Sequence, residues 1–251
     1  MRHSPLDDLV SAITGLGADV DGSVAHGQAR PDLNREGRTG APEVIYARGK
    51  DFEQLRAIVA TFVERTGRAI VSRVAESEAQ QLIAEYPEHA IRYERRAQMM
   101  VIRRADYHVP TGGRVGIITA GTSDLPAATE ARVLAEEMGC ETTVISDVGV
   151  AGLHRLFVPL HAMLESDVDV IVVAAGMDGA LPSVVSGLVN VPVIGLPTST
   201  GYGVGGRGIA ALLSMLQTCA PGLSVVNVDN GVGAGVTAAL IANRAARARR
   251  T

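Results

Sequence analysis

From residue 112 onward, short apolar stretches alternate with segments of helical periodicity. The stretch 168–174 is apolar at nearly every position, which is typical of a strand that is covered on both faces. The pattern predicts strands at 114–119, 142–146, 168–174, 191–196 and 224–228, and helices at 126–138, 154–165, 181–188, 209–217 and 236–247. Five strands separated by helices predict a parallel sheet with right-handed crossovers and helices on both faces.

The pattern before residue 112 is less regular and predicts a smaller α/β unit. Strands are expected at 43–47 and 69–74, helices at 51–65 and 77–86, and one further strand within 91–103. Residues 1 to about 40 are mixed in character and are assigned no element. We therefore predict a small α/β domain over residues 1–110 and a larger α/β domain over residues 111–251.

Composition changes near the same boundary. Charged residues number 31 within 1–111 and only 19 within 112–251, whereas glycines rise from 8 to 20. The sequence Pro110-Thr111-Gly112-Gly113 is typical of a linker. The charge and glycine distributions therefore support a boundary at this point.

Charge and hydropathy exclude several classes of protein. The formal charge of −4 provides no basic field to attract nucleic acid. The sequence has no run of roughly 18 apolar residues, so no membrane span is predicted. Residues 1–20 lack the pattern of a signal peptide. Two cysteines make no disulfide framework, and no cysteine–histidine group has zinc spacing. These features predict a cytoplasmic protein with no nucleic-acid or membrane partner.

Cys219 is the most informative single residue. It lies between the predicted helix 209–217 and the predicted strand 224–228, and glycine-rich loops are predicted before and after that unit, at 201–208 and 230–235. A thiol at such a boundary is a candidate nucleophile. The alternative is a small buried hydrophobe, which is what most free cysteines are.

Polar turns follow the predicted strands, where parallel sheets bind their ligands. Gly121, Thr122, Ser123 and Asp124 open a helix, so they suit a phosphate, although helix capping by Ser123 or Asp124 would also explain them.

A second turn contains Gly176, Met177, Asp178 and Gly179. Burial beside a substrate would raise the pKa of Asp178 toward that of a general base, while an N-cap role is the equal alternative.

Two further motifs carry weaker signals. His154 and Arg155 open a predicted helix, where a histidine can transfer protons and an arginine can bind phosphate; a surface helix start is the commoner explanation. The segment 203–208 matches the dinucleotide-binding glycine pattern, with Asp229 about 20 residues later. Its first glycine does not follow a strand directly, so a hydride-transferring enzyme is not expected.

Taken together, the second domain resembles the carboxylase domain of phosphoribosyl-aminoimidazole carboxylases, which implies a flavodoxin-like fold. The shared marks are the turn Gly121–Pro126, His154-Arg155, the loop Gly176–Pro182, Pro192–Pro197 and the helix Leu212–Gln217. Longer motifs are similar to the LarB family, which begins synthesis of the nickel-pincer nucleotide cofactor of lactate racemase. These are Asp147–Arg155, Pro197–Gly203, Ser224–Gly235 and, in the first domain, Gly40–Tyr46 with Lys50.

Cys219 favours the LarB family over the purine carboxylases. The LarB family has a catalytic cysteine at this position, whereas the purine carboxylases have a methionine-like residue and use no thiol. One departure is Asp178, where the LarB pattern has glutamate. The shorter side chain withdraws the carboxylate by one methylene, which puts its proton-transfer role in question.

The resemblance implies that nicotinic acid adenine dinucleotide is carboxylated at C5 of its pyridinium ring and hydrolysed to a mononucleotide and AMP. Cys219 would add to C4, and Asp178, or His154 as the second candidate, would transfer the proton. The substrate-binding residues implied are Gly121, Thr122, Ser123, Asp124, Arg155, Gly176, Met177, Gly179, Thr198, Ser199, Tyr202, Asn230, Gly231 and Arg73.

The resemblance also implies partners. CO2 or bicarbonate is the co-substrate, no organic cofactor is expected, and Mg²⁺ would suit the hydrolytic half because a metal can neutralise charge on the leaving phosphate; no ligand set for it is visible. A homo-oligomer is implied, possibly an octamer like the purine carboxylases. Two alternatives stay open: a purine-pathway aminoimidazole ribonucleotide carboxylase or mutase, and a non-catalytic nucleotide-binding module.

Overall fold

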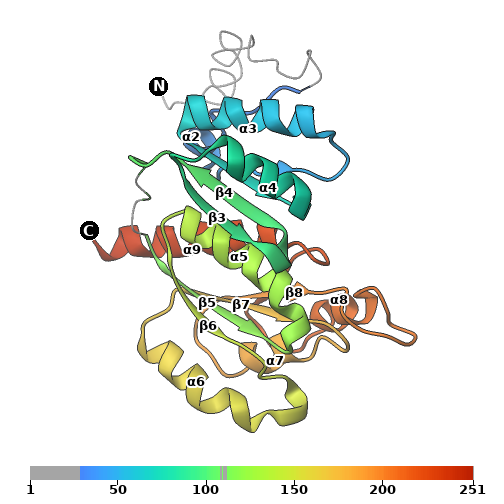
Figure 1. The fold of residues 1–251 in the computed structure, drawn as a ribbon. Helices are drawn as coiled ribbons and strands as arrows, with labels where there is room; N and C mark the ends of the chain where they lie inside the picture. The colour runs from blue at the N-terminus through green and yellow to red at the C-terminus, as the bar shows by residue number, and fades with distance from the viewer. Residues whose placement is uncertain (1–28, 108, 110–111, 251) are drawn as a thin grey trace, which may run out of the picture.

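The computed structural model describes residues 29–107, 109 and 112–250, which form two sheets with their helices (Figure 1). The predicted linker and residues 1–28 lie largely outside the described residues. The larger sheet has the order β6-β5-β7-β8-β9 and is parallel throughout. Its strands are β5 (Arg114–Thr119), β6 (Glu141–Ile145), β7 (Val170–Ala175), β8 (Val193–Pro197) and β9 (Leu223–Val225).

The strand order confirms the predicted flavodoxin-like topology. The chain begins in the centre at β5, steps to the edge at β6, and returns to continue through β7 on the other side. Loops therefore leave β5 and β7 in opposite directions, which creates a switch point where such sheets bind ligands.

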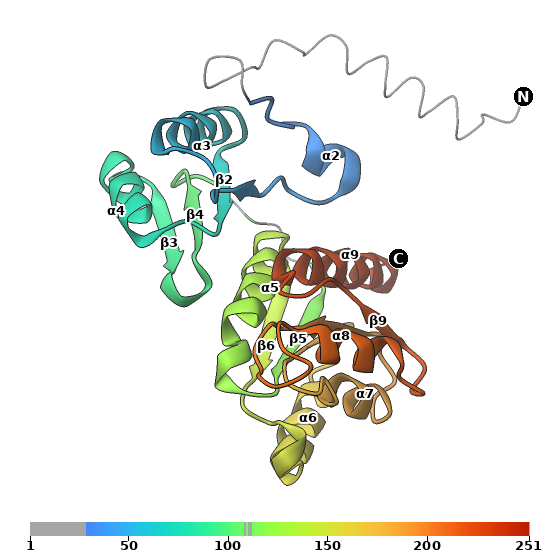
Figure 2. The same cartoon turned by 90° about the vertical axis from the view of Figure 1, so that its right-hand side faces the viewer.

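Helices cover both faces of this sheet (Figure 2). Two helices pack on one face through small side chains, among them Ala131 and Ala238, and three pack on the other through Leu156, Val185 and Met215. The first pair is α5 (Leu125–Glu137) and α9 (Gly231–Arg249); the second group is α6 (His154–Glu165), α7 (Leu181–Ser186) and α8 (Ile209–Leu216).

Helix α9 begins five residues earlier than the sequence predicts. Asn230 caps it by accepting a hydrogen bond from Gly233 N at 2.8 Å. Glycine is required at these helical positions because α5 lies very close. A Cβ on Gly231 would lie 2.2 Å from Ala127 O, and one on Gly235 would lie 2.4 Å from Ala131 O. The glycine-rich segment at 231–235 is therefore a helix-packing surface, and its prediction as a loop is wrong.

The smaller sheet has the order β1-β2-β4-β3, with β1 parallel to β2 and the other pairs antiparallel. Helices α3 and α4 pack on one face of it around Leu55 and Leu82. Its elements are α2 (Arg35–Thr39), β1 (Ile45–Tyr46), α3 (Phe52–Thr66), β2 (Arg68–Ser72), α4 (Glu76–Glu85), β3 (Ala90–Glu94) and β4 (Met99–Arg103).

One prediction for this region is wrong, because 91–103 holds two strands and not one. Strands β3 and β4 pair as a hairpin through the short 3₁₀ turn Arg95–Ala97. Gln98 closes the turn with a φ of 51°, in the left-handed region that any residue but glycine enters at a cost. No glycine or proline marks the reversal, so the sequence pattern does not reveal it.

The second face of the smaller sheet packs against α5. Ile70, Met99 and Val101 form a buried cluster with Val133 and Leu134 of α5. Alternate residues of β2 and β4 thus face α3 and α4 on one side and α5 on the other, as the two-residue period of a strand requires. Helix α5 is shared by both halves of the molecule and sets how each meets the other.

Candidate active site

The loops at the carboxyl ends of β5, β7, β8 and β9 are bound to one another by hydrogen bonds. Asp124 links the first to the third: its Oδ2 accepts from Gly121 N at 2.9 Å and its Oδ1 accepts from Thr198 Oγ1 at 2.6 Å. Burial raises the pKa of Asp124, against the lowering effect of these hydrogen bonds. Asp124 does not cap α5 through its side chain. Its carboxylate ties two loops of the sequence-predicted site together.

The loop after β7 lies against the loop after β8. Met177 N donates to Thr200 O at 2.8 Å, and Thr200 Oγ1 donates to Ser123 O at 3.3 Å. A Cβ on Gly176 would lie 2.2 Å from Thr200 O, so only glycine permits this approach. Ser123, Thr122 and Ser199 keep exposed side chains at this edge.

Asp229 fixes the loop after β9. Its Oδ1 accepts from Ser199 N at 2.8 Å, and its own backbone N donates to Pro197 O at 2.9 Å. Asn230 and Gly231, both predicted in the site, follow directly and begin α9. This loop therefore has a defined position beside Ser199.

The smaller half of the molecule reaches this loop through Arg73. Its Nη2 donates to Asp229 O at 3.0 Å, and its Nε lies 3.2 Å from Glu130 Oε1 on α5. Glu130 is only 3% exposed, and burial raises its pKa to about 7, with Arg73 lowering it and Asp229 raising it further. Arg73 thus contacts both the loop after β9 and α5, and its role in binding substrate stays a prediction.

Sequence reasoning missed Glu130. Nothing in the local pattern of α5 separates it from solvent-facing glutamates of an amphipathic helix. Only the packing of Gly231 against α5, with its backbone over the Glu130 side chain, buries it. The burial of Glu130 therefore depends on a tertiary contact, which the local sequence does not reveal.

His154 and Arg155 lie beside the loop after β6. Arg155 Nη1 contacts Asp147 Oδ2 at 2.9 Å, and Gly149 N donates to Ala120 O at 2.9 Å. The loop is thereby pinned to the end of β5, next to the Gly121 turn. His154 is exposed as the first residue of α6.

Asp178 is exposed. Helix α7 has Ala180 at its N-cap with no side-chain cap, so the N-cap alternative for Asp178 is wrong, and its role as a base stays a prediction. Its Oδ1 accepts a 3.4 Å hydrogen bond from Ala180 N. Gly179 beside it has a φ of 61°, and a Cβ there would lie 2.6 Å from Ala211 O. The Asp178 carboxylate stands at the rim of the site, and Tyr202, 83% exposed, stands in solvent.

Cys219 does not join these loops within one chain. Helix α8 carries the chain back across the sheet, so Cys219 lies beside the amino ends of the strands. The following residues show this: Pro221 O accepts from Ser186 Oγ at the end of α7, and Gly222 O accepts from Val193 N at the start of β8. The five residues of β8 separate this edge from the loops, about 15 Å at the usual rise. The expectation that Cys219 stands among its own chain's loops is wrong.

The two thiols differ in their exposure to solvent, which a nucleophile needs in order to reach its substrate. Cys219 is exposed, whereas Cys140 is buried and its pKa is raised by burial to about 11. Cys140 Sγ contacts Asn243 Oδ1 at 3.4 Å and serves packing. Cys219 is the reactive candidate.

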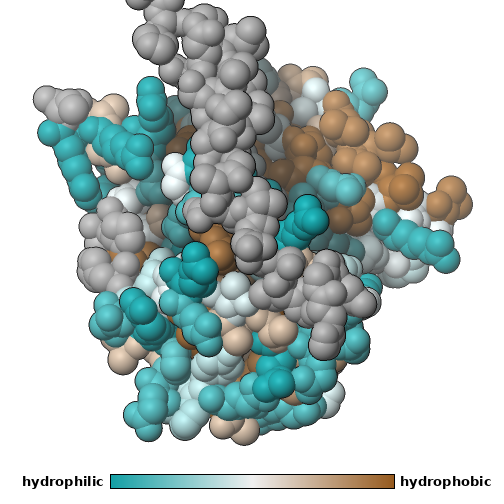
Figure 3. Space-filling model, turned by 90° about the horizontal axis from the view of Figure 1, so that it is seen from above, coloured by the Kyte–Doolittle hydropathy of each residue, from teal (hydrophilic) through white to brown (hydrophobic). Residues whose placement is uncertain are grey.

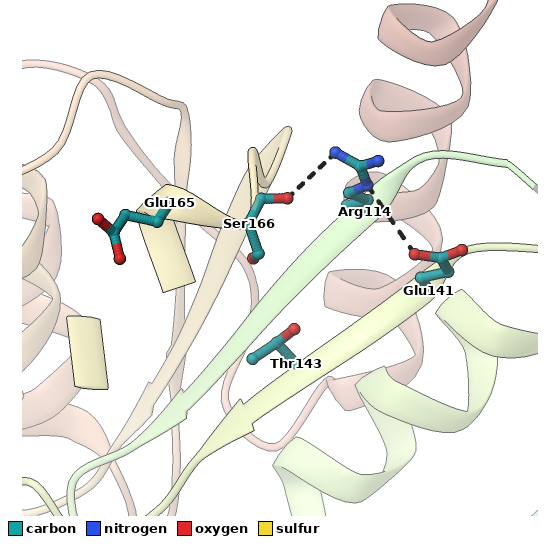
Figure 4. Close-up of a pocket in the computed structure, with 5 residues that line it drawn as sticks. All are labelled: Arg114, Glu141, Thr143, Glu165 and Ser166. Atoms are coloured by element: carbon teal, nitrogen blue, oxygen red, sulfur yellow. Dashed lines mark hydrogen bonds and ion pairs between the residues drawn. The ribbon is translucent and has the colours of Figure 1, made fainter. Parts of the chain in front are cut away.

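A hollow of about 430 Å³ lies at the amino ends of β5 and β6 (Figure 4). Arg114 crosses it and contacts Ser166 O and Glu141, and Thr143 and Glu165 complete the lining. It lies at the opposite edge from the loops described above. Its arginine is already satisfied by protein groups, so it offers no reactive constellation.

Neither a metal centre nor a membrane helix is found in the described part of the chain. Over residues 29–107, 109 and 112–250, no group of three or more His, Cys, Asp or Glu side chains is placed to hold a metal. Over the same ranges, no helix is long and apolar enough to cross a membrane.

The fold and the loop cluster define an α/β protein with a candidate site at the carboxyl edge of a flavodoxin-like sheet. The chain belongs to the AIR carboxylase family, whose model matches residues 114–250, and it carries a LarB/PurE-like N-terminal domain over residues 24–104. The resemblance predicted from the sequence is confirmed.

Relatives match most of the chain or about half of it. An uncharacterised protein of Methanocaldococcus jannaschii is 47% identical over 216 residues, covering 84% of this chain and 82% of its own. The N5-carboxyaminoimidazole ribonucleotide mutase of Thermotoga maritima is 34% identical over 133 residues, covering 51% of this chain and 74% of its own. The mutase of the same name from M. jannaschii is 35% identical over 127 residues, covering 50% and 74%.

Proposed function

We propose that this protein carboxylates the pyridinium ring of nicotinic acid adenine dinucleotide at C5 and hydrolyses its phosphoanhydride, giving pyridinium-3,5-biscarboxylic acid mononucleotide and AMP. Membership of the AIR carboxylase family places it among carboxylase-type enzymes. The observation that carries the finer proposal is the LarB/PurE-like N-terminal domain joined to a carboxylase domain whose accessible thiol is Cys219.

The thiol is needed to make the pyridinium ring reactive toward CO2. A pyridinium ring is poor in electrons and does not attack CO2. Addition of the Cys219 thiolate to C4 forms a carbon–sulfur bond and moves the ring electrons toward nitrogen, which leaves a neutral enamine with a nucleophilic C5. C5 then bonds to the carbon of CO2. A base removes the proton from C5, and the sulfur leaves C4 with its electron pair as aromaticity returns.

The proton transfer is assigned to Asp178 first and to His154 second. Both are exposed at the carboxyl edge, where a bound ring would have access to either side chain. Ser123, Thr122 and the backbone N–H groups of the Gly121 turn suit the ribose and phosphates. A divalent metal would neutralise charge at the phosphoanhydride, but no step is derived through one here.

The test is mass spectrometry of the product formed from the dinucleotide and ¹³C-bicarbonate. The wild-type protein should yield AMP and a mononucleotide that carries one labelled carboxyl group. Cys219→Ser should lower this rate on the order of 10³-fold or more, as loss of a nucleophile does, while Cys140→Ser retains it. Equal product from Cys219→Ser would refute the thiol mechanism.

A second candidate is carboxylation or carboxyl migration on an aminoimidazole ribonucleotide. It is favoured by one observation, that Cys219 lies at the opposite edge from the loops of its own chain, and by the mutases among the relatives. Incubation with each aminoimidazole ribonucleotide and CO2 distinguishes the candidates. Turnover there that is indifferent to Cys219→Ser would favour the mutase.

A further inference from the structure

We infer that Glu130 is a positioning residue, which acts through Arg73 to hold the loops after β8 and β9 and thereby sets how tightly the site binds its nucleotide. The inference rests on the proposed function for the identity of that nucleotide, because Ser199 and Asn230 in these loops are predicted to bind the dinucleotide. Glu130 itself is buried, so it acts on the substrate only through other residues.

The hydrogen bonding of the Glu130 carboxylate is incomplete. Glu130 lies in the second turn of α5 and is 3% exposed. Arg73 Nε lies 3.2 Å from its Oε1, and Arg73 Nη2 donates to its Oε2 at 3.5 Å. Among the described residues, none donates a hydrogen bond of good geometry to Oε1. The charge of Arg73 is therefore the main compensation for the ionised carboxylate.

Stability alone does not account for a carboxylate at this position. Burial raises the pKa of Glu130 to about 7, with Arg73 lowering it and Asp229 raising it further. Beside these two charged groups, α9 presents the backbone of Gly231, where a Cβ would lie 3.0 Å from Oε2. A buried ionised group costs free energy that a neutral amide of the same shape does not. A buried acid with a perturbed pKa and a specific charge partner is characteristic of a functional site.

Arg73 connects Glu130 to the loops. The Nη2 that faces Glu130 also donates to Asp229 O at 3.0 Å, and Asp229 Oδ1 accepts from Ser199 N at 2.8 Å. A guanidinium is a rigid planar fork, so a carboxylate that aligns one edge of it also sets the direction of its other donors. Arg73 and Asp229 have φ values of 57° and 55°, and such conformations persist only while the surrounding contacts hold them. Loss of the charge on Glu130 would therefore loosen the loops after β8 and β9.

A second carboxylate limits how far this loosening extends. Asp124, which precedes α5, accepts a hydrogen bond from Thr198 Oγ1 at 2.6 Å, and this contact does not involve Glu130. The end of β8 would thus stay in place while the residues after it gain freedom. The proton-transfer candidates, His154 and Asp178, lie on other loops. We therefore expect Glu130 to affect substrate binding more than the chemical step.

The contacts of Glu130 do not involve the exposed apolar surface of the molecule. Hydrophobic side chains gather on the side where α8 lies (Figure 3), and that helix exposes Ile209, Leu213 and Leu216. Glu130 is covered by Arg73 and by the start of α9 instead. Replacing Glu130 with glutamine leaves the apolar surface unchanged, so a change in the loops cannot be attributed to that surface.

The first test is hydrogen exchange followed by mass spectrometry, which uses no activity. At pH 8, peptides that cover 197–203 and 226–231 should exchange roughly tenfold faster in Glu130→Gln than in the wild-type protein, because a hydrogen bond to an ionised group is about twice as strong as one to a neutral group. Peptides of the buried strand β7 should exchange no faster. At pH 5.5, where Glu130 is protonated, the loops of the two proteins should exchange at the same rate.

The matched control is Glu136→Gln, near the C-terminal end of the same helix, which removes a pair with Arg92 of the N-terminal half and should leave loop exchange unchanged. Arg73→Gln should loosen the loops as Glu130→Gln does, and the double variant should loosen them no further, because both changes break one contact. Equal loop exchange in Glu130→Gln and the wild-type protein at pH 8, or faster exchange in Glu136→Gln, would overturn the inference.

The second test separates binding from chemistry. At pH 8, Glu130→Gln should raise KM for nicotinic acid adenine dinucleotide about tenfold and keep kcat within about twofold, which is the pattern of lost uniform binding. As pH falls through 7, Glu130 of the wild-type protein takes up a proton, so the ratio of the two KM values should approach one. A lower KM in the variant would show that Glu130 acts on the phosphates by its charge, and a lower kcat at unchanged KM would show that it acts on the chemical step. Either result would overturn the inference.

The two proposals can fail separately. A protein that does not carboxylate the dinucleotide, but whose loops exchange faster in Glu130→Gln, would keep the positioning role and lose the proposed function. A carboxylase whose KM and loop exchange are both indifferent to Glu130→Gln would do the reverse.

Discussion

Several residues at the site hold backbone conformations that only glycine adopts freely. Arg73, Asp147, Met177 and Asp229 have φ values of 57°, 59°, 48° and 55°. Asp147, Met177 and Asp229 follow β6, β7 and β9 of the larger sheet, and Arg73 follows β2 of the smaller sheet. Such conformations cost about 1–3 kcal/mol and collect where function over-determines the backbone. Strain is not confined to this edge, because Asp167, with a φ of 57°, lies before β7 at the opposite edge.

The two cysteines should react very differently with a thiol reagent at neutral pH. Cys219 is exposed, while Cys140 is buried with a pKa raised to about 11, and thiolate fraction and access control the rate. We expect one thiol labelled in the folded protein and two in urea, with peptide mass mapping placing the first at Cys219. Labelling of Cys140 in the folded state would contradict the structure.

Glu130 should make stability depend on pH. Its pKa is about 7 in the folded protein against an ordinary value of 4.5, so the folded state binds the proton more tightly. The stabilising contribution is present below about pH 4.5 and is lost as pH rises through 7, by roughly 3 kcal/mol at most. The charged groups that act on it are Arg73 and Asp229, and Gly231 of α9 packs against its side chain.

Urea unfolding of Glu130→Gln between pH 5 and 8 checks this sign. The variant should gain stability relative to wild type as pH rises, with the difference levelling above pH 8. Glu64→Gln, an exposed glutamate on α3, controls for loss of a carboxylate. A constant difference between Glu130→Gln and wild type across the range would remove Glu130 as a group titrating near neutrality.

At the scale of elements, α5 and α9 depend on glycine at their contact. A Cβ on Gly235 would lie 2.4 Å from the backbone oxygen of Ala131, which cannot move without shifting α5. We expect Gly235→Ala to lower the free energy of unfolding by about 1–3 kcal/mol, as overpacking does.

The matched control is Gly37→Ala in α2, where a Cβ would have open space. That change should be neutral or stabilising by up to about 1 kcal/mol, because alanine favours helix over glycine. Urea unfolding measures both. An equal loss in the two variants would argue against the close α5–α9 contact.

The sequence predicted most of the larger sheet because its strands are buried on both faces and its helices are periodic. Residues 114–119 and 154–165 were predicted with the bounds that β5 and α6 have. The hairpin at β3 and β4 was missed, because its turn depends on Gln98 and not on glycine. The start of α9 was missed because its glycines serve helix contact.

Prediction of the site was uneven for a physical reason. Ligands bind at the carboxyl ends of parallel strands, and this rule grouped the loops that contain Ser123, Thr198 and Asn230. The positions of these loops depend on topology alone. Cys219 was misplaced although topology also governs it: a residue between a crossover helix and the next parallel strand must lie at the amino edge. Glu130 could not be found, because its burial arises from contacts between elements distant in sequence.

At the scale of the whole molecule, the two halves are joined by buried charge as well as by apolar packing. Arg68 and Glu137 are 3% and 2% exposed and lie 3.2 Å apart, and Arg68 also contacts Glu36 at 2.8 Å. Tyr107 lies 5.0 Å from the guanidinium. Removing one partner of a buried pair leaves a charge without compensation.

We therefore expect Arg68→Ala to lower the free energy of unfolding by roughly 3 kcal/mol or more. Arg56→Ala, which removes an exposed pair with Glu53 on α3, should cost less than about 1 kcal/mol. Urea unfolding compares them. Similar losses for the two arginines would show that the interface charge contributes no more than a surface pair.

Three acidic side chains of α5 each meet an arginine from the N-terminal half: Glu130 with Arg73, Glu136 with Arg92, and Glu137 with Arg68. Without the N-terminal half, α5 would expose these three carboxylates, together with Val133 and Leu134, which that half otherwise covers. A chimera that grafts the carboxylase module onto another protein would thus have to import all three arginines. For the carboxylase domain to exist as a free-standing protein, these three glutamates would first have to be replaced.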